Sequence, residues 1–258
     1  MRTLVAALLL VPAAALAGSS AFDGTWKMQP DSLKVSGKPD SYLLADGTYT
    51  CSSCNPALTV KADGAEHAVT GHAYYDSVTV KVVNPSTIEI TYHRAGKVSG
   101  HDTITVSADG KTFSDKFVNY DGTKEVNGSF TGKRVSTGPA GAHAISGEWL
   151  TDQLTAANDA ATIVSYQLSG EHFKMSSNGQ SYDAQFDGKE YAVVGDPGHT
   201  TVTLKRIAAN TVEETDHRQG KVTDVIRIAT AADGKTIHVE DKDVAHGQTA
   251  TMTLDKQP

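Results

Sequence analysis

Residues 92–98 read YHRAGKV, and residues 216–222 read DHRQGKV, 124 positions further along the chain. The shared phrase belongs to a longer repeat, because Gly24-Thr25-Trp26 matches Gly147-Glu148-Trp149 at an offset of 123, and ADGKT at residues 108–112 recurs at 232–236. Collinear matches of this kind indicate a duplicated segment, and the period exceeds the roughly 20 to 50 residues of solenoid repeats. Each copy is therefore expected to fold as a domain with its own core.

Within each copy, short runs of alternating apolar and polar residues are separated by turn dipeptides. The alternation is clearest over residues 78–82, 88–92 and 104–106, and Asp109-Gly110 and Asp121-Gly122 stand between runs, where glycine supplies the positive φ of tight turns. No run after residue 17 has the pattern of an amphipathic helix of ordinary length. The sequence therefore predicts an all-β protein, in which the antiparallel strands of each copy either close into a barrel or stack as a sandwich.

Three features resemble the calycin plan of lipocalins and related ligand-binding barrels: a Gly-x-Trp on the first strand, a meander of hairpins, and a basic residue on the last strand. More closely, VTLKRIAANTVEE at residues 202–214, followed by HRQGKV and ADGKT, is similar to exported bacterial lipocalin-like domains of unknown function. The resemblance implies two tandem up-and-down barrels. It also implies that Trp26 and Trp149 each close one barrel end, with Arg134 and Lys256 as the cations that pack across such rings.

The repeat and the composition also predict the organisation of the chain. Residues 1–17 have the layout of a secretory signal peptide, barrels are expected at 22–135 and 144–257, and the Gly/Pro/Ala-rich segment 136–143 is expected to link them. The formal net charge of −7 argues against nucleic acid and anionic membranes as partners. No integral membrane segment is expected in the mature chain, which is predicted to be secreted or periplasmic.

The two cysteines, Cys51 and Cys54, are separated by two residues. In an exported chain, this spacing predicts a disulfide that closes a small loop. Two alternatives are thiol–disulfide exchange, which usually places such a motif at a helix N-terminus, and metal binding with help from His67 or His72. The second copy has Met175 and Asn178 in the corresponding positions, so the fold does not require the bridge.

Strand parity suggests which side chains point into the barrels. Arg94 shares a face with Ile88, Ile90 and Tyr92, and in the second copy several of the corresponding positions are charged. The candidate ligand-binding residues are Tyr92, Arg94, Arg206, Glu214, Asp216, Arg218 and Asp224. Two alternatives stay open: Arg94 and Arg218 close hairpins by pairing with local carboxylates, or a one-residue bulge reverses the inward face.

The sequence lacks a nucleophile elbow, a phosphate-binding loop, a dinucleotide fingerprint and a helical pair of histidines, so no catalytic residue, metal site or cofactor is predicted. The favoured function is a non-enzymatic binding protein that holds a small, partly hydrophobic ligand in its barrels, with the first interior more apolar than the second. The alternatives are an envelope structural or interaction module with filled barrels, and a redox or hydrolytic enzyme.

Overall fold

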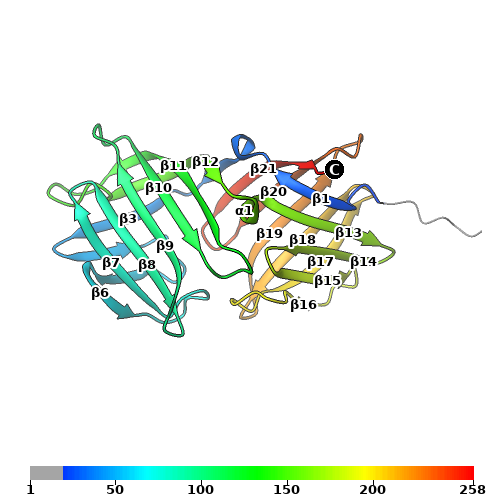
Figure 1. Cartoon of the computed structure of the whole chain (residues 1–258), viewed down its shortest axis with the longest axis horizontal. Helices are drawn as coiled ribbons and strands as arrows, with labels where there is room; N and C mark the ends of the chain where they lie inside the picture. The colour runs from blue at the N-terminus through cyan, green and yellow to red at the C-terminus, as the bar shows by residue number, and fades with distance from the viewer. Residues whose placement is uncertain (1–19) are drawn as a thin grey trace, which may run out of the picture.

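A computed structural model describes residues 20–258 as two antiparallel β-sheets, each curled into a nearly closed barrel (Figure 1). The predicted all-β architecture of two tandem antiparallel barrels is confirmed. The expected signal peptide at residues 1–17 lies outside the described residues. No helix within residues 20–258 is long and apolar enough to cross a membrane.

The first barrel is a ten-stranded sheet with the order β5-β4-β3-β12-β11-β10-β9-β8-β7-β6. Its strands are β3 (Asp40–Ala45), β4 (Thr48–Cys51), β5 (Leu58–Lys61), β6 (Asp63–Ala68), β7 (Ser77–Asn84), β8 (Thr87–Arg94), β9 (Lys97–Val106), β10 (Thr112–Asn119), β11 (Val126–Thr137) and β12 (Gly147–Ala157).

The second barrel is an eleven-stranded sheet with the order β15-β14-β13-β1-β21-β20-β19-β18-β17-β16, and β2 pairs with β21 beside this path. Its strands are β1 (Gly24–Met28), β2 (Lys34–Gly37), β13 (Ile163–Ser169), β14 (His172–Ser177), β15 (Gln180–Gln185), β16 (Tyr191–Ala192), β17 (Thr201–Ala208), β18 (Thr211–Arg218), β19 (Lys221–Thr230), β20 (Thr236–Asp243) and β21 (Gln248–Lys256). Two short helices, η1 (Pro30–Ser32) and α1 (Asp159–Thr162), complete the described chain.

The two repeats exchange their first strands. Strand β1 of the first repeat lies between β13 and β21 of the second, and β12 of the second repeat lies between β3 and β11 of the first. The registers correspond, because Trp26 is opposite Lys256 and Trp149 is opposite Arg134. Either Gly-x-Trp strand fits either place by sequence, so the repeat alone does not reveal the exchange.

This pairing corrects the boundaries that were expected from the repeat. Residues 24–28 belong to the second sheet although 22–135 was predicted as the first barrel, and residues 147–157 belong to the first sheet although 144–257 was predicted as the second. Segment 136–143, expected as the linker, includes the end of β11 and part of the loop from β11 to β12, which pair with each other. The chain crosses between the sheets at residues 38–39, between β2 and β3, and at residues 158–162, which include α1.

Each tryptophan is buried at one end of the barrel that contains it. The indole nitrogen of Trp149 donates to the Ile145 carbonyl at 2.8 Å, and the Arg134 guanidinium lies 3.9 Å from the ring centroid. In the other barrel, Trp26 donates to the Phe22 carbonyl at 2.9 Å, and the Lys256 ammonium lies 5.2 Å from its ring centroid. Both tryptophans are at most 1% exposed, so the cations cover fully buried aromatic rings.

The repeated phrase His-Arg-x-Gly-Lys-Val forms the hairpins β8–β9 and β18–β19. Ala95 and Gly96 have φ angles of 50° and 74°, and Gln219 and Gly220 have 52° and 72°. Two consecutive positive φ angles are typical of the type I′ turn, which matches the twist of antiparallel strands and favours glycine. Both hairpins carry a bulge at the histidine, between Tyr92 and His93 in one and at the corresponding position in the other.

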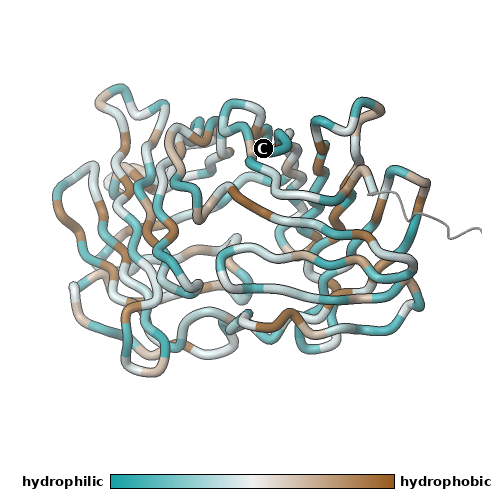
Figure 2. The backbone as a smooth tube through the Cα atoms, turned by 45° about the vertical axis from the view of Figure 1, so that its right-hand side comes forward, coloured by the Kyte–Doolittle hydropathy of each residue, from teal (hydrophilic) through white to brown (hydrophobic). Residues whose placement is uncertain are grey.

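Each barrel has its own hydrophobic core, and hydrophobic residues recur between hydrophilic ones along the strands of both halves (Figure 2).

The two barrels also touch through a turn of the second. Asn178, between β14 and β15, accepts hydrogen bonds from the backbone nitrogens of Thr123 and Lys124 and donates to the Lys124 carbonyl. The exchanged strands and this contact hold the barrels side by side.

Candidate functional site

The interior of the first barrel is apolar toward the Trp149 end. Val78, Val80, Ile88 and Ile90 alternate inward on β7 and β8, and each is at most 2% exposed. Val82, expected to continue this row, is 43% exposed because it lies next to a bulge where β7 leaves the register of β8. The buried rows of these two strands form the apolar part of the interior.

Two aspartates interrupt this apolar interior. Asp102 lies opposite Ile90, and Asp115 lies between Ile104 and Phe130 on the neighbouring strands. The hydroxyl of Tyr92 donates to Asp102 Oδ2 at 2.8 Å. Asp115 is 6% exposed, and its Oδ1 is buried without a hydrogen-bond partner among residues 20–258.

Burial changes the protonation of both aspartates. It raises the pKa of Asp102 to about 6. The hydrogen bond from Tyr92 favours the carboxylate and lowers this pKa, but by less than burial raises it. The pKa of Asp115 is raised to about 8, first by burial and then by repulsion from Asp102. The register makes the two side chains diagonal neighbours on β9 and β10, roughly 7 Å apart at Cα.

Tyrosine rings surround these carboxyls. Tyr42 and Tyr49 stack with ring centroids 6.2 Å apart, and Tyr75 lies 5.0 Å from Tyr92 and 4.4 Å from the ring of His72. Burial, and to a smaller extent the charges of Asp102 and Asp115, raises the pKa of Tyr49 above its usual range, and its ring packs in the core of the same barrel. Phenols in this setting stay protonated and act as hydrogen-bond donors.

Arg94 lies at the open end of the same barrel, away from Trp149. Its guanidinium forms an ion pair with Asp121 at 2.9 Å, and its side chain is 35% exposed. This geometry corresponds to the alternative in which the arginine pairs with a local carboxylate. Among the residues expected to bind ligand in the first copy, Tyr92 therefore lies in the buried interior and Arg94 lies at its rim.

The second barrel has a larger group of acidic side chains inside. Glu214 is 6% exposed and accepts a 2.5 Å hydrogen bond from the hydroxyl of Tyr182. Asp216 pairs in register with Asp224, and Asp241 lies one strand further, on the row of Glu214. Burial and mutual repulsion raise the pKa of Glu214 to about 7, of Asp216 to about 8 and of Asp241 to about 7.

The two arginines of the second copy that were expected to bind ligand lie apart from Glu214. Arg206 is exposed, 4.6 Å from the ring centroid of Phe186, and donates to the Gly170 carbonyl. Arg218 donates to the hydroxyl of Thr200 at 3.1 Å and lies 5.1 Å from the ring of Tyr74 in the first barrel. The positive charge of Arg218 lowers the pKa values of Asp216 and Asp224, against the burial that raises them.

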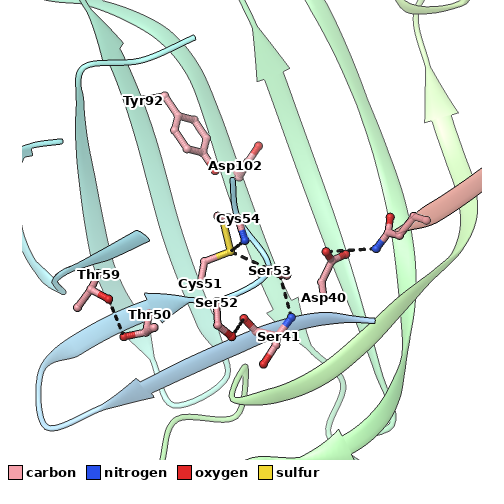
Figure 3. Close-up of a disulfide and its surroundings, with 11 residues drawn as sticks. Asp40, Ser41, Thr50, Cys51, Ser52, Ser53, Cys54, Thr59, Tyr92 and Asp102 are labelled. Carbon is pink, nitrogen blue, oxygen red and sulfur yellow. Dashed lines mark hydrogen bonds between the residues drawn. A yellow bond between two sulfur atoms is a disulfide. The ribbon is translucent and has the colours of Figure 1, made fainter. Parts of the chain in front are cut away.

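The cysteines form the expected disulfide at the end of β4, with Cα atoms 5.4 Å apart (Figure 3). Cys51 is 1% exposed and packs in the core of the first barrel, and the Cys54 nitrogen donates to the Cys51 sulfur. Tyr92 and Asp102 lie close to this loop (Figure 3). A buried sulfur at a strand end lacks the exposure and the helix dipole that activate thiols for exchange.

Two grooves lie where the barrels meet. One has a volume of about 500 Å³ and is lined by Tyr74, Phe117 and Leu154, among others, and another of about 670 Å³ runs along α1, β13 and β14. Phe117 is two positions beyond Asp115, so it lies on the same face of β10 and borders the open end of the first barrel. Within residues 20–258, no group of three or more His, Cys, Asp or Glu side chains is arranged to hold a metal ion.

The sequence prediction missed Asp102, Asp115, Asp241 and Tyr182. Asp115 was recognisable, because Phe113-x-Asp115-x-Phe117 alternates like an inward-facing row. In comparisons with known proteins, the chain matches no family model, no curated protein and no solved structure. The geometry of the two interiors is therefore the feature from which function can be inferred.

Proposed function

We propose that this chain is an exported, non-enzymatic binding protein that holds a small, partly hydrophobic molecule inside its barrels, with the first barrel as the main site. The observation that carries the proposal is the buried, unpaired Oδ1 of Asp115 in an otherwise apolar row. A buried polar atom without a partner is costly, and a ligand that satisfies it recovers that cost.

The surroundings of Asp115 support this proposal. An apolar part formed by the buried valines and isoleucines offers area for a hydrophobic body, and Tyr92 and Asp102 offer directed polar contacts. Mostly apolar interiors with a few convergent polar groups are typical of small-molecule sites. In the second barrel, Glu214, Asp216, Asp224 and Arg218 supply a more polar set of contacts, which we assign to a second, more polar site.

Export is supported by the disulfide, since such bridges form and persist mainly in oxidising compartments. The rival function, a structural or interaction module, is favoured by the grooves at the barrel junction, where a partner protein would find apolar side chains such as Leu154. A binding protein would hold a small molecule in its barrel interiors, whereas an interaction module would have interiors filled by its own side chains.

Native mass spectrometry of the full protein, purified from cells that produce it without denaturation, tests the proposal. A retained small molecule that is released on unfolding is the expected result. Tyr92→Phe and Glu214→Gln each alter one interior, so the variant that loses the added mass identifies the barrel. Wild-type protein that carries no added mass and takes up none from an extract of the same cells would favour the interaction module.

A further inference from the structure

Asp115 differs from Asp216 and Asp224 of the second barrel in its counter-charge. Arg218 acts on Asp216 and Asp224 in the second barrel, whereas the charge that acts most on Asp115 is the negative one of Asp102. The ion pair of Arg94 is formed with Asp121 at the rim. His101 lowers the pKa of Asp102, so Asp115 is the member of the pair on which no cationic side chain of residues 20–258 acts.

The groups around this pair favour positive charge. Tyr92 donates a hydrogen bond to Asp102 and contacts Tyr75, and Tyr42 and Tyr49 stack in the core of the same barrel, so the interior carries aromatic rings whose faces attract cations. The unpaired Oδ1 of Asp115 needs a donor, which an ammonium group provides with up to three hydrogens. Charge-assisted hydrogen bonds of this kind are stronger than neutral ones.

The position of Asp115 sets the rest of the ligand. It lies in the row of Ile88, Ile104 and Phe130, deeper than Tyr92 and closer to the Trp149 end. The remaining atoms of a cation bound at this depth would lie against the apolar side chains of this row. A hydrated inorganic ion is poorly suited to such surroundings, whereas an amine with an aryl or alkyl group fits them.

Resting on the proposed binding function, we infer that the first barrel binds a small organic ammonium ion, with its nitrogen at Asp115 and Asp102 and its apolar part among the tyrosine rings and aliphatic side chains. The positive charge of the ligand takes the place of the protons that the two carboxyls hold at lower pH. Binding therefore releases protons near neutral pH, because both aspartates titrate in that range without ligand.

Isothermal titration calorimetry on the full chain at pH 7.5 tests the ligand class with three probes of similar shape: 2-phenylethylammonium, 2-phenylethanol and 3-phenylpropionate. We expect the ammonium ion to bind at least about tenfold more tightly than the alcohol, and the carboxylate to bind least. Repetition in buffers of different ionisation enthalpy is expected to show proton release.

Asp115→Asn keeps the shape of the side chain and removes its charge. We expect it to lower the affinity for the ammonium ion at least about tenfold and to change the affinity for the alcohol little. Asp102→Asn serves as a second variant, and Asp46→Asn, on an exposed turn of the same barrel, is the control that should bind like wild type. Thermal unfolding confirms that each variant is folded.

Equal affinity for the ammonium ion and the alcohol would overturn the ligand class while leaving the binding function intact. An ammonium affinity that Asp115→Asn and Asp102→Asn leave unchanged would overturn the assigned site. If none of the three probes binds, the inference fails, and the retained mass in native mass spectrometry then decides separately whether the protein is a carrier.

Discussion

The guanidinium of Arg134, on the last strand of the first repeat, lies 3.9 Å from the ring centroid of Trp149, on the first strand of the second repeat. In the other barrel the roles are reversed: Lys256, on the last strand of the second repeat, lies 5.2 Å from the ring centroid of Trp26, on the first strand of the first repeat. Each barrel end is therefore closed by residues from both repeats. This reciprocal arrangement makes the folding of one barrel depend on a strand of the other.

Loss of either tryptophan should destabilise the protein. Trp149→Ala and Trp26→Ala remove fully buried rings and are each expected to lower the free energy of unfolding by about 3 to 5 kcal/mol. Urea denaturation monitored by circular dichroism measures the change. A loss below about 1 kcal/mol would contradict the role of these residues as the closing residues of the barrel ends.

Arg134 should contribute less than the ring it covers. Its side chain donates to the carbonyls of Ser146 and Ala144 at 2.7 and 2.6 Å, so Arg134→Met removes two charge-assisted hydrogen bonds at partly buried carbonyls and is expected to cost about 1 to 3 kcal/mol. Lys133→Met is the control, because Lys133 is exposed and its pairing with Asp152 is of the surface type that contributes little. Equal effects of the two substitutions would argue against a specific role for Arg134.

Strand exchange predicts which fragments fold. A fragment of residues 38–158 contains β3 to β12 and should unfold cooperatively, whereas residues 38–135, which lack both β1 and β12, should not. The shorter sheet would leave β3 and β11 as open edges and the Trp149 pocket unfilled. Circular dichroism melts distinguish the fragments, and cooperative unfolding of 38–135 would show that a Gly-x-Trp strand is not required to complete the first sheet.

Stability is expected to fall as the pH rises from about 5 to 8. Burial raises the pKa of Asp115 and Asp216 to about 8 and of Glu214 to about 7, above the ordinary values of 3.8 and 4.5 that apply in the unfolded chain. The native state therefore holds protons that the unfolded state has lost. For each proton that only the native state holds, the free energy of unfolding falls by about 1.4 kcal/mol for every unit by which the pH rises.

Thermal unfolding across this pH range measures the effect. The double variant Asp115→Asn/Asp216→Asn should show a flatter dependence and a higher melting temperature than wild type at pH 8. A wild-type melting temperature that rises between pH 5 and 8 would show that the pKa values of these carboxyls are not raised in the native protein.

Removal of the disulfide should have a modest effect. The bridge closes a loop of four residues, for which the chain-entropy relation gives about 2 kcal/mol. The double variant Cys51→Ser/Cys54→Ser is expected to stay folded with a stability lower by that amount or less. Rapid formation of mixed disulfides by the native protein in a glutathione redox buffer would instead favour the thiol–disulfide exchange role.

The sequence predicted strands and hairpins well because their signals are local. Alternation identified the inward rows of β7 and β8, and the paired turn at Ala95-Gly96 follows from the positive φ angles that glycine permits. The exchange of β1 and β12 was missed because two Gly-x-Trp strands compete for equivalent places. The choice between them depends on loops and on barrel contacts, such as that of Asn178, that the repeat does not encode.

The interior chemistry was predicted only in part. Glu214 and Asp216 were found because they replace apolar residues of the first copy, whereas Asp102 and Asp115 were missed because their counterparts in the second copy, Ile226 and Val239, are apolar. Whether a carboxyl is paired depends on residues from neighbouring strands, and this information comes from the register.

A crystal structure of the protein purified directly from producing cells, with no added ligand, tests the central claim most directly. The account predicts electron density for a small organic molecule in the first barrel, with a nitrogen within hydrogen-bond distance of Asp115 Oδ1 and an apolar part beside Tyr49 and Ile90. A well-ordered first interior in which Asp115 contacts only protein atoms or water, in protein that takes up no molecule on soaking with 2-phenylethylammonium, would contradict it.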